Sequence, residues 1–160
     1  MFRTISIEHY EQRLDLLPPP MRHRLKGLYL PLGRDAKAIA LSQTGGGTPE
    51  MHVPPAGQRL VLVEGDLHVD GNLDLNDLPA KGEDKSLGLI VTGNLTCDRL
   101  INTWLGNILV GGDLKVHDVF VNSAENCYAG VLGSADVYFY HGMETWLEVD
   151  GKARLTYGDS

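Results

Sequence analysis

A seven-residue pattern of aliphatic and polar positions recurs along the C-terminal two-thirds of the chain. It reads aliphatic, any residue, Gly, a small polar residue, aliphatic, any residue, aliphatic. Its six copies, the last two with Ala in place of the second aliphatic residue, begin at Val63, Val69, Val91, Val110, Val131 and Val149. From Gly71 onward the glycines of successive copies lie 22, 19, 21 and 18 residues apart. Such near-regular spacing indicates a repeated structural unit.

Each copy predicts a strand, a bend and a second strand. Aliphatic residues at alternate positions on both sides of the glycine place their side chains on one face of a strand. The glycine permits a bend or a close backbone approach, and the small polar residue can hydrogen-bond the backbone of the turn. Repeated about every 20 residues, this unit describes one coil of a parallel β-helix. We therefore expect a mainly β fold, a parallel β-helix (solenoid) of about four to five coils over residues 59–160.

Other architectures fit the pattern less well. A doubly wound α/β sheet would need amphipathic helices between the strands, and the intervals show no helical period. An antiparallel sandwich stays open as an alternative.

Residues 76–86 are polar and are predicted to form a surface loop in the first full coil.

Polar side chains are expected to stack between coils. Asp66, Asn94 and Asp113 follow the glycine at equivalent coil positions, which favours a ladder that caps the turns. The alternative is a cluster of catalytic carboxylates of the kind that carbohydrate-active β-helix enzymes carry. Asn102 and Asn122 each end a second aliphatic strand, which predicts stacked asparagines at another corner.

Residues 1–58 are expected to form a short N-terminal α/β cap. A helical stripe precedes three prolines at 18–20 and comprises Ile7, Tyr10, Leu14 and Leu17. A second short helix is expected around Met21–Leu28 and a third over Asp35–Leu41. Because an open solenoid end exposes strand edges and apolar surface, this segment is the natural cover for it.

Charge divides the chain of 160 residues into two parts. The net charge is −7, with +3 over residues 1–60 and −10 over residues 61–160. An acidic solenoid disfavours nucleic acid as a direct partner and favours a basic protein, although the acidity could also serve solubility alone.

Without a signal peptide or a membrane-spanning stretch, the expected location is the cytoplasm. Cys97 and Cys127 fit that location as reduced, buried thiols.

Patterns typical of catalysis or cofactor binding are missing from the sequence. The glycines at 45–47 are not followed by the Gly-Lys-Ser/Thr of a phosphate loop. The six histidines show no metal-ligand spacing on one element. We therefore expect no enzyme activity, no cofactor and no metal.

Aromatic and acidic residues concentrate near the C-terminus, as in protein-binding hot spots. Simple alternation predicts that Val137 and Phe139 face the core, while Tyr138 and Tyr140 face water. The candidate partner-binding residues are Tyr138, Tyr140, His141, Glu144, Trp146, Glu148, Glu125, Tyr128 and Trp104. The alternative is that the aromatic residues simply cover the last coil.

The runs LVLVEGDLHVDGNL (60–73), LIVTGNL (89–95) and ILVGGDL (108–114) resemble a loose group of bacterial β-solenoid proteins with V-x-G-D-L-x-V coils. The resemblance covers about residues 58–155. Some members look like immunity proteins encoded beside polymorphic or type VI secretion toxins, and others resemble the polymer-forming bactofilins. The polar loop, the aromatic end and the N-terminal segment depart from the more uniform bactofilins.

The resemblance therefore implies an immunity protein that occludes the active site of a cognate toxin. A nuclease toxin would be basic to hold phosphate, and an acidic solenoid could mimic that charge. The expected assembly is a monomer or a one-to-one complex with the toxin. A bactofilin-like scaffold and a carbohydrate-active enzyme are the alternatives.

Overall fold

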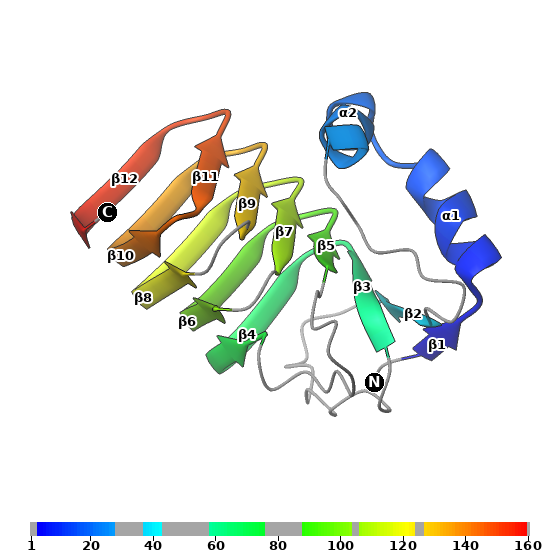
Figure 1. The fold of residues 1–160 in the computed structure, drawn as a ribbon, viewed down its shortest axis with the longest axis horizontal. Helices are drawn as coiled ribbons and strands as arrows, with labels where there is room; N and C mark the ends of the chain where they lie inside the picture. The colour runs from blue at the N-terminus through cyan, green and yellow to red at the C-terminus, as the bar shows by residue number, and fades with distance from the viewer. Residues whose placement is uncertain are drawn as a thin grey trace.

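Two parallel sheets wound into a β-solenoid dominate the computed structural model (Figure 1). The structure describes residues 3–27, 37–42, 58–75, 88–103, 106–123 and 127–159. The predicted loop over residues 76–86 and the glycines at 45–47 lie outside these ranges.

Sheet A contains, in spatial order, β1 (Arg3–Ile5), β2 (Lys37–Ser42), β3 (Gln58–Glu64), β5 (Gly88–Val91), β7 (Asn107–Val110), β9 (Tyr128–Val131) and β11 (Trp146–Val149). Sheet B contains β4 (Leu67–Asp74), β6 (Leu95–Asn102), β8 (Leu114–Ser123), β10 (Ala135–Met143) and β12 (Ala153–Asp159). From β3 onward the chain alternates between the sheets, and each strand pairs in parallel with the strand one coil earlier.

The prediction of a mainly β parallel solenoid is confirmed, and the parallel pairing excludes an antiparallel sandwich. Three coils, β5–β6, β7–β8 and β9–β10, have a coil on each side. The solenoid thus makes about three enclosed turns, slightly fewer than the four to five coils expected.

Inward side chains stack in rows because equivalent residues of successive coils are in register. One such row on sheet A consists of Val63, Val91, Val110, Val131 and Val149. The row on sheet B contains Val69, Cys97, Val116 and Val137, all buried. Stacking like on like removes the apolar side chains from water along the whole solenoid, which is the main source of its stability.

The coil corners contain the predicted ladder. The backbone N–H of Asn94 donates to Asp66 Oδ1, that of Asp113 to Asn94 Oδ1, and that of Ser134 to Asp113 Oδ1, each at 2.7 Å. The glycine before each of these residues is required, because a Cβ on Gly93 would stand 2.7 Å from the carbonyl carbon of Gly65. The turn-capping interpretation is therefore confirmed.

The copy of the pattern that begins at Val69 does not form a coil corner. Gly71 lies inside β4 with φ 109°, and nothing would crowd a Cβ there. The glycine that stacks below Gly93 is Gly65, whose carbonyl accepts the Gly93 N–H at 2.9 Å. The copy beginning at Val69 therefore forms the second strand of its coil and the bend within that strand.

The predicted asparagine stack is also present. Asn102 and Asn122 are fully buried and stand in register on β6 and β8. Asn102 Nδ2 donates to Asn122 Oδ1 at 2.8 Å and to the Gly106 carbonyl at 2.9 Å. The stack thus satisfies backbone groups at the second corner.

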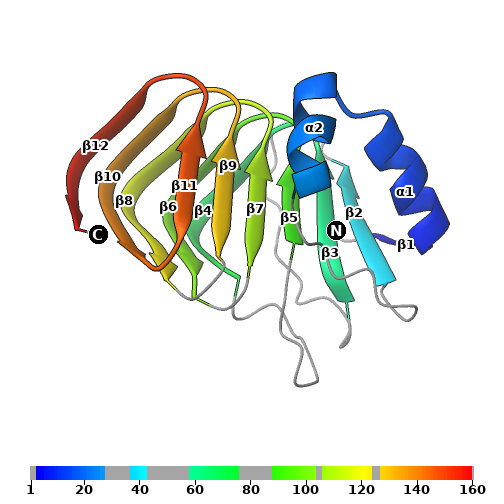
Figure 2. The ribbon, with the colours of Figure 1, turned by 45° about the horizontal axis from the view of Figure 1, so that its top comes forward.

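Two helices cover the outer face of sheet A (Figures 1 and 2). Helix α1 (Ile7–Asp15) begins after Ser6, whose side chain accepts the His9 N–H. Helix α2 (Pro19–Gly27) begins at the prolines, which lack the N–H that a first turn would leave unpaired. Both helices were expected from the apolar stripe.

Buried residues of the helices contact one outward residue on each of three neighbouring strands. This cluster comprises Ile5, Tyr10, Leu17, Met21, Leu62, Ile90 and Leu109. We expected residues 1–58 to cover the open end of the solenoid. The two helices lie along its side, against the outer face of sheet A, while β1 and β2 of the same segment extend the N-terminal edge of sheet A.

The expected third helix over Asp35–Leu41 was wrong as well. Residues Lys37–Ser42 form β2, which pairs in parallel with β3. Ala and Leu in the run Ala-Ile-Ala-Leu favour a helix locally, and pairing with β1 and β3 overrides this preference.

Candidate functional site

Exposed apolar side chains gather on the last two coils. Six large hydrophobic residues are exposed in the described part of the chain, and five of them lie between residues 138 and 157. These five are Tyr138, Met143, Trp146, Leu155 and Tyr157. The sixth, Leu16, lies in the turn between the two helices.

Tyr138 and Tyr157 form an aromatic pair on sheet B. Their ring centroids are 5.5 Å apart, with the planes at 71°. Each ring stays at least half exposed, at 50% and 58%. Trp146 is 59% exposed on sheet A, where it alternates with the inward Leu147. Rigid, amphipathic rings of this kind are the side chains that dominate protein–protein contacts.

Tyr140 does not belong to this surface, so the expectation that it faces water was wrong. It is buried against Phe120, with ring centroids 5.4 Å apart, and Phe139 is partly exposed. The strands bend at this point, and the β8–β10 register shifts between Val137 and Phe139. Two consecutive residues, Tyr138 and Phe139, therefore face outward, which reverses the alternation after the bend.

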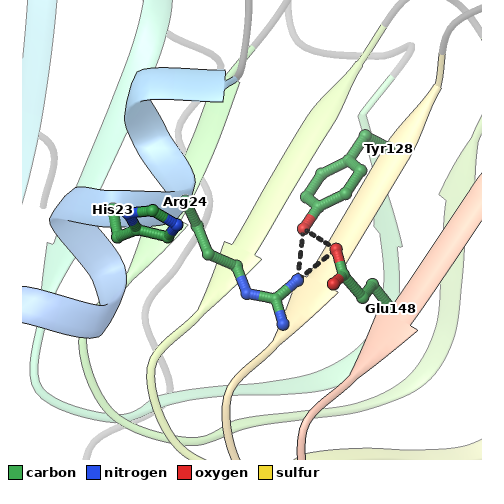
Figure 3. A pocket seen from close by; sticks show the side chains of 4 residues that line it. All are labelled: His23, Arg24, Tyr128 and Glu148. Atoms are coloured by element: carbon green, nitrogen blue, oxygen red, sulfur yellow. Dashed lines mark hydrogen bonds and ion pairs between the residues drawn. The ribbon is translucent and has the colours of Figure 1, made fainter.

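Tyr128 and Glu148 are joined to helix α2 through Arg24 (Figure 3). The guanidinium of Arg24 donates to Tyr128 Oη at 2.7 Å and forms ion pairs with Glu148 and Asp150. Tyr128 Oη in turn donates to Glu148 Oε2 at 2.9 Å. We call Arg24, Tyr128, Glu148 and Asp150 the Arg24 cluster.

The Arg24 cluster shifts the pKa of two of its members. Burial lowers the pKa of Arg24, but the hydrogen bond to Tyr128 and the carboxylates of Asp150 and Glu148 outweigh it, so the net pKa rises. For Tyr128, in contrast, burial raises the pKa. The hydrogen bond to Glu148 raises it further, and the opposing effect of Arg24 is smaller than the sum of the two, so the net pKa of Tyr128 is raised. Arg24 thus stays charged and Tyr128 neutral, as a fixed contact between α2 and sheet A requires.

A shallow cavity of about 280 Å³ adjoins the cluster and is lined by His23, Arg24, Tyr128 and Glu148. Figure 3 shows the Arg24 side chain reaching from the helix toward Tyr128 and Glu148, which already occupy its donors. The arrangement holds the helix in place and leaves little unused hydrogen-bonding capacity for a ligand.

The remaining candidate residues are scattered. His141 is partly buried on β10, and Glu144 is exposed with φ 55° at the turn between β10 and β11. Trp104 and Glu125 lie outside the described residues. The structure therefore brings Tyr138 together with Tyr157, Glu148 with Tyr128, and separates both pairs from Tyr140.

Arg24, Leu155 and Tyr157 were not singled out as site residues from the sequence. Arg24 stands 104 residues before Tyr128, and no local pattern links them. For Tyr128 and Tyr140, which the sequence analysis named as candidates, a signal of a packing role did exist: Tyr128-Ala-Gly130 and Tyr140-His-Gly142 share a tyrosine two positions before Gly. In both, the tyrosine fills the space beside the glycine, and the Tyr128 hydroxyl lies 2.7 Å from where a Cβ of Gly130 would stand.

No group of three or more His, Cys, Asp or Glu side chains in the described part of the chain could hold a metal ion. The carboxylates of Asp66 and Asp113 accept backbone N–H groups, as the ladder requires. Within the same ranges, neither helix is long and apolar enough to cross a membrane.

Comparison with known proteins leaves the site to be interpreted on its own geometry. No protein-family model, curated protein or solved structure matches the chain.

Proposed function

We propose that this chain is an immunity protein that binds a cognate secreted bacterial toxin and occludes its active site. One observation carries the proposal: five of the six exposed large hydrophobic residues in the described part of the chain lie within residues 138–157. Soluble proteins usually bury such groups, and a cluster of exposed aromatic residues is typical of a protein-binding surface.

The contact residues in this proposal are Tyr138 and Tyr157 on sheet B, Trp146 on sheet A, and Met143 at the end of β10, next to the turn that leads to Trp146. Tyr138 and Tyr157 support each other edge to face, so little conformational entropy is lost when they contact a partner. Trp146 projects from a strand whose neighbour Leu147 packs in the core, which holds the indole in position. The surface is thus prearranged for binding.

Charge directs the choice of partner toward a basic protein such as a nuclease. The chain has a net charge of −7. Two acidic side chains near the aromatic residues are paired within the chain, Asp136 with Arg154 and Glu148 with Arg24. The exposed Glu144, at the turn between Met143 and Trp146, adds a carboxylate beside the aromatic surface. Complementary charge would speed the encounter with the toxin in the cytoplasm.

Co-purification with the product of the adjacent gene tests the proposal. We expect a one-to-one complex that abolishes the toxicity of that product in cells. Tyr138→Ala and Trp146→Ala should each weaken the complex by about 30-fold, as expected for a hot-spot residue worth about 2 kcal/mol.

Leu16→Ala is the matched control, because Leu16 is exposed but lies on the turn between the helices. It should leave the affinity unchanged. A neighbouring gene product that forms no complex with the folded protein and stays toxic would refute the immunity role. Equal losses in all three variants would place the contact elsewhere.

A further inference from the structure

The strands of sheet B bend halfway along their length, and the outer face of the sheet after the bend carries apolar side chains. On β10 the bend lies at the register shift between Val137 and Phe139. After it Leu100, Phe120 and Tyr140 point into the core, so the residues that alternate with them face outward. These outward residues are partly or fully exposed. We call the apolar ones on the three central strands the outer strip: Ile101, Val119, Val121, Phe139 and Met143.

The outer strip lies on the side of the stack and not at its end. Its residues belong to β6, β8 and β10, the strands of sheet B that have a neighbour on each side. Register places Ile101 beside Val121 and Val119 beside Phe139, so these side chains form one continuous patch. The two described helices lie over sheet A, and neither covers the strip (Figures 1 and 2).

The strip also connects the contact residues of the proposed function. Along β10 the outward positions run from Tyr138 through Phe139 and His141 to Met143, directly before the turn that leads to Trp146. Tyr138 and Trp146 by themselves are exposed rings on two different sheets. The strip between them makes one surface that reaches from the bend of sheet B to the start of β11.

The surroundings of the strip are acidic. Asp74 on β4, in register with Ile101, contributes one carboxylate. The strand halves that carry the strip and the turn after β10 add three carboxylates and one guanidinium, those of Asp98, Asp118, Glu144 and Arg99. Although Asp118 pairs with Arg99, the balance over these side chains is −3. Such a border attracts a basic partner and disfavours a second copy of the same face.

Sheet A of the same molecule shows what covers an outward apolar row that meets a carboxylate. Its row, in register across the strands, consists of Leu62, Ile90 and Leu109. Further along the same row stands Glu148. Helix α2 contains three Lys or Arg and no Asp or Glu. It packs Met21 against the row and pairs Arg24 with Glu148. The cover on sheet A is therefore a basic amphipathic helix.

We propose that the outer strip binds an amphipathic helix whose apolar stripe is flanked by Lys and Arg. The inference rests on the proposed function in one respect, since it assigns this helix to the toxin. Apolar residues of the helix would cover Val121 and Phe139, while its basic residues would lie near Asp74 and Glu144. Burial of the apolar stripe supplies affinity, and the opposite charges fix the orientation of the helix.

A designed peptide tests this chemistry without the toxin. The probe is a peptide of about 18 residues with Leu at helical spacing and Lys elsewhere, and its control has Glu in place of each Lys. In titrations of the methyl-labelled full chain, the signals of Ile101, Val119 and Val121 should shift. The methyl signal of Thr96, which faces outward before the bend, should not. The Leu/Lys peptide should bind at least ~10-fold more tightly than the Leu/Glu peptide.

Two variants that add the same charge test the strip against the toxin. Val121→Lys places a cation in the middle of the strip, and Thr96→Lys places it before the bend on a strand that is equally enclosed. Val121→Lys should raise the Kd of both the Leu/Lys peptide and the adjacent gene product at least ~30-fold. Thr96→Lys should change either Kd less than ~3-fold. The peptide titration of the wild type decides the proposal should Val121→Lys fail to fold.

Each outcome separates the strip from the immunity role. Methyl shifts spread over both halves of sheet B, equal binding of the two peptides, or equal effects of the two substitutions would overturn the proposal. A toxin that binds Val121→Lys as tightly as the wild type would refute the strip as its contact and leave the immunity role intact. A gene product that binds no form of the chain would refute that role, while the peptide still decides whether the strip takes a basic helix.

Discussion

At each coil corner a polar side chain and a glycine of the next coil lie in close contact. The Asp113 carboxylate accepts the Ser134 N–H, and a Cβ on Gly133 would stand 2.6 Å from the Gly112 carbonyl oxygen. The glycine is therefore needed for the close approach of two coils, and the small polar residue for the hydrogen bond. Each requirement explains one letter of the repeat.

Asp113→Ala should lower the free energy of unfolding by about 1 kcal/mol, because the Ser134 N–H loses its acceptor. Asp113→Asn is the matched control: its amide oxygen can accept as Asn94 does one coil earlier. Urea denaturation at neutral pH measures both. Equal destabilisation by the two substitutions would show that the hydrogen bond does not stabilise the corner.

Cys97 makes stability depend on pH in the alkaline range. Burial, with a smaller effect of Asp98, raises the pKa of the Cys97 thiol from 9.0 to about 12. The thiol binds its proton more tightly in the folded state, so its contribution is complete below pH 9 and is lost as the pH rises toward 12. The buried neighbours in its row are Val69 and Val116.

In Cys97→Val this loss should disappear. Relative to Cys97→Val, the wild type should lose about 1 kcal/mol of unfolding free energy per pH unit between pH 9 and 12. Tyrosine ionisation affects both proteins and cancels in the difference. Chemical denaturation across this range measures the effect, and a difference that stays constant with pH would contradict it.

Among the elements, the helix pair is held to sheet A by an apolar cluster and by the Arg24 cluster. Met21 is fully buried and lies over Gly111, where a Cβ would stand 2.7 Å from its sulfur. Arg24, 12% exposed, joins the same helix to β9 and to the last coil. Because the carboxylates of Glu148 and Asp150 are exposed, dissolved salt screens their ion pairs with Arg24. The apolar contact of Met21 should therefore contribute most of the stability of the helix pair on sheet A.

Met21→Ala should therefore destabilise the protein by about 2–5 kcal/mol, the range for truncating a buried side chain without full collapse of the cavity. Leu16→Ala, at an exposed position of the intervening turn, should change it by less than about 0.5 kcal/mol. Limited proteolysis should cut Met21→Ala first within the helices. Unchanged stability of Met21→Ala would show that the helices contribute nothing to the fold.

The whole molecule is a stack in which each coil contacts its neighbours only. Stability in such a stack is a sum over coils and the interfaces between them. The coils β7–β8 and β9–β10 have neighbours on both sides, while β11–β12 has one. Local opening should therefore begin at the C-terminal end.

Hydrogen exchange of the full chain measures this gradient. Amides of β8 and β10 should exchange slowest, and those of β12 fastest among the strands of sheet B, since only one neighbour holds them. Uniform protection from β4 to β12 would instead indicate that the solenoid opens as a single unit.

Much of the solenoid could be predicted from the sequence because its determinants are local. Alternation at i and i+2 decides which side chains face inward, and the glycine with its polar neighbour marks each corner. The stacks of Asp113 and of Asn102 follow from repeating these units at one period. The error at Tyr140 also has a local cause: a bend in the strand shifts the alternation by one residue, and the repeat pattern does not reveal it.

Only the tertiary structure decided how the parts join. An apolar helix stripe shows that a helix is covered but not by which surface, so the position of α1 and α2 on the side of sheet A could not be derived. Arg24 meets Asp150 across 126 residues of chain, a contact created by the docking of α2. For the same reason, the contacts of Tyr128 and Glu148 with Arg24 could not be predicted from the sequence. Repetition in the sequence determines the coil, whereas contacts between unlike segments arise only when the folded surfaces meet.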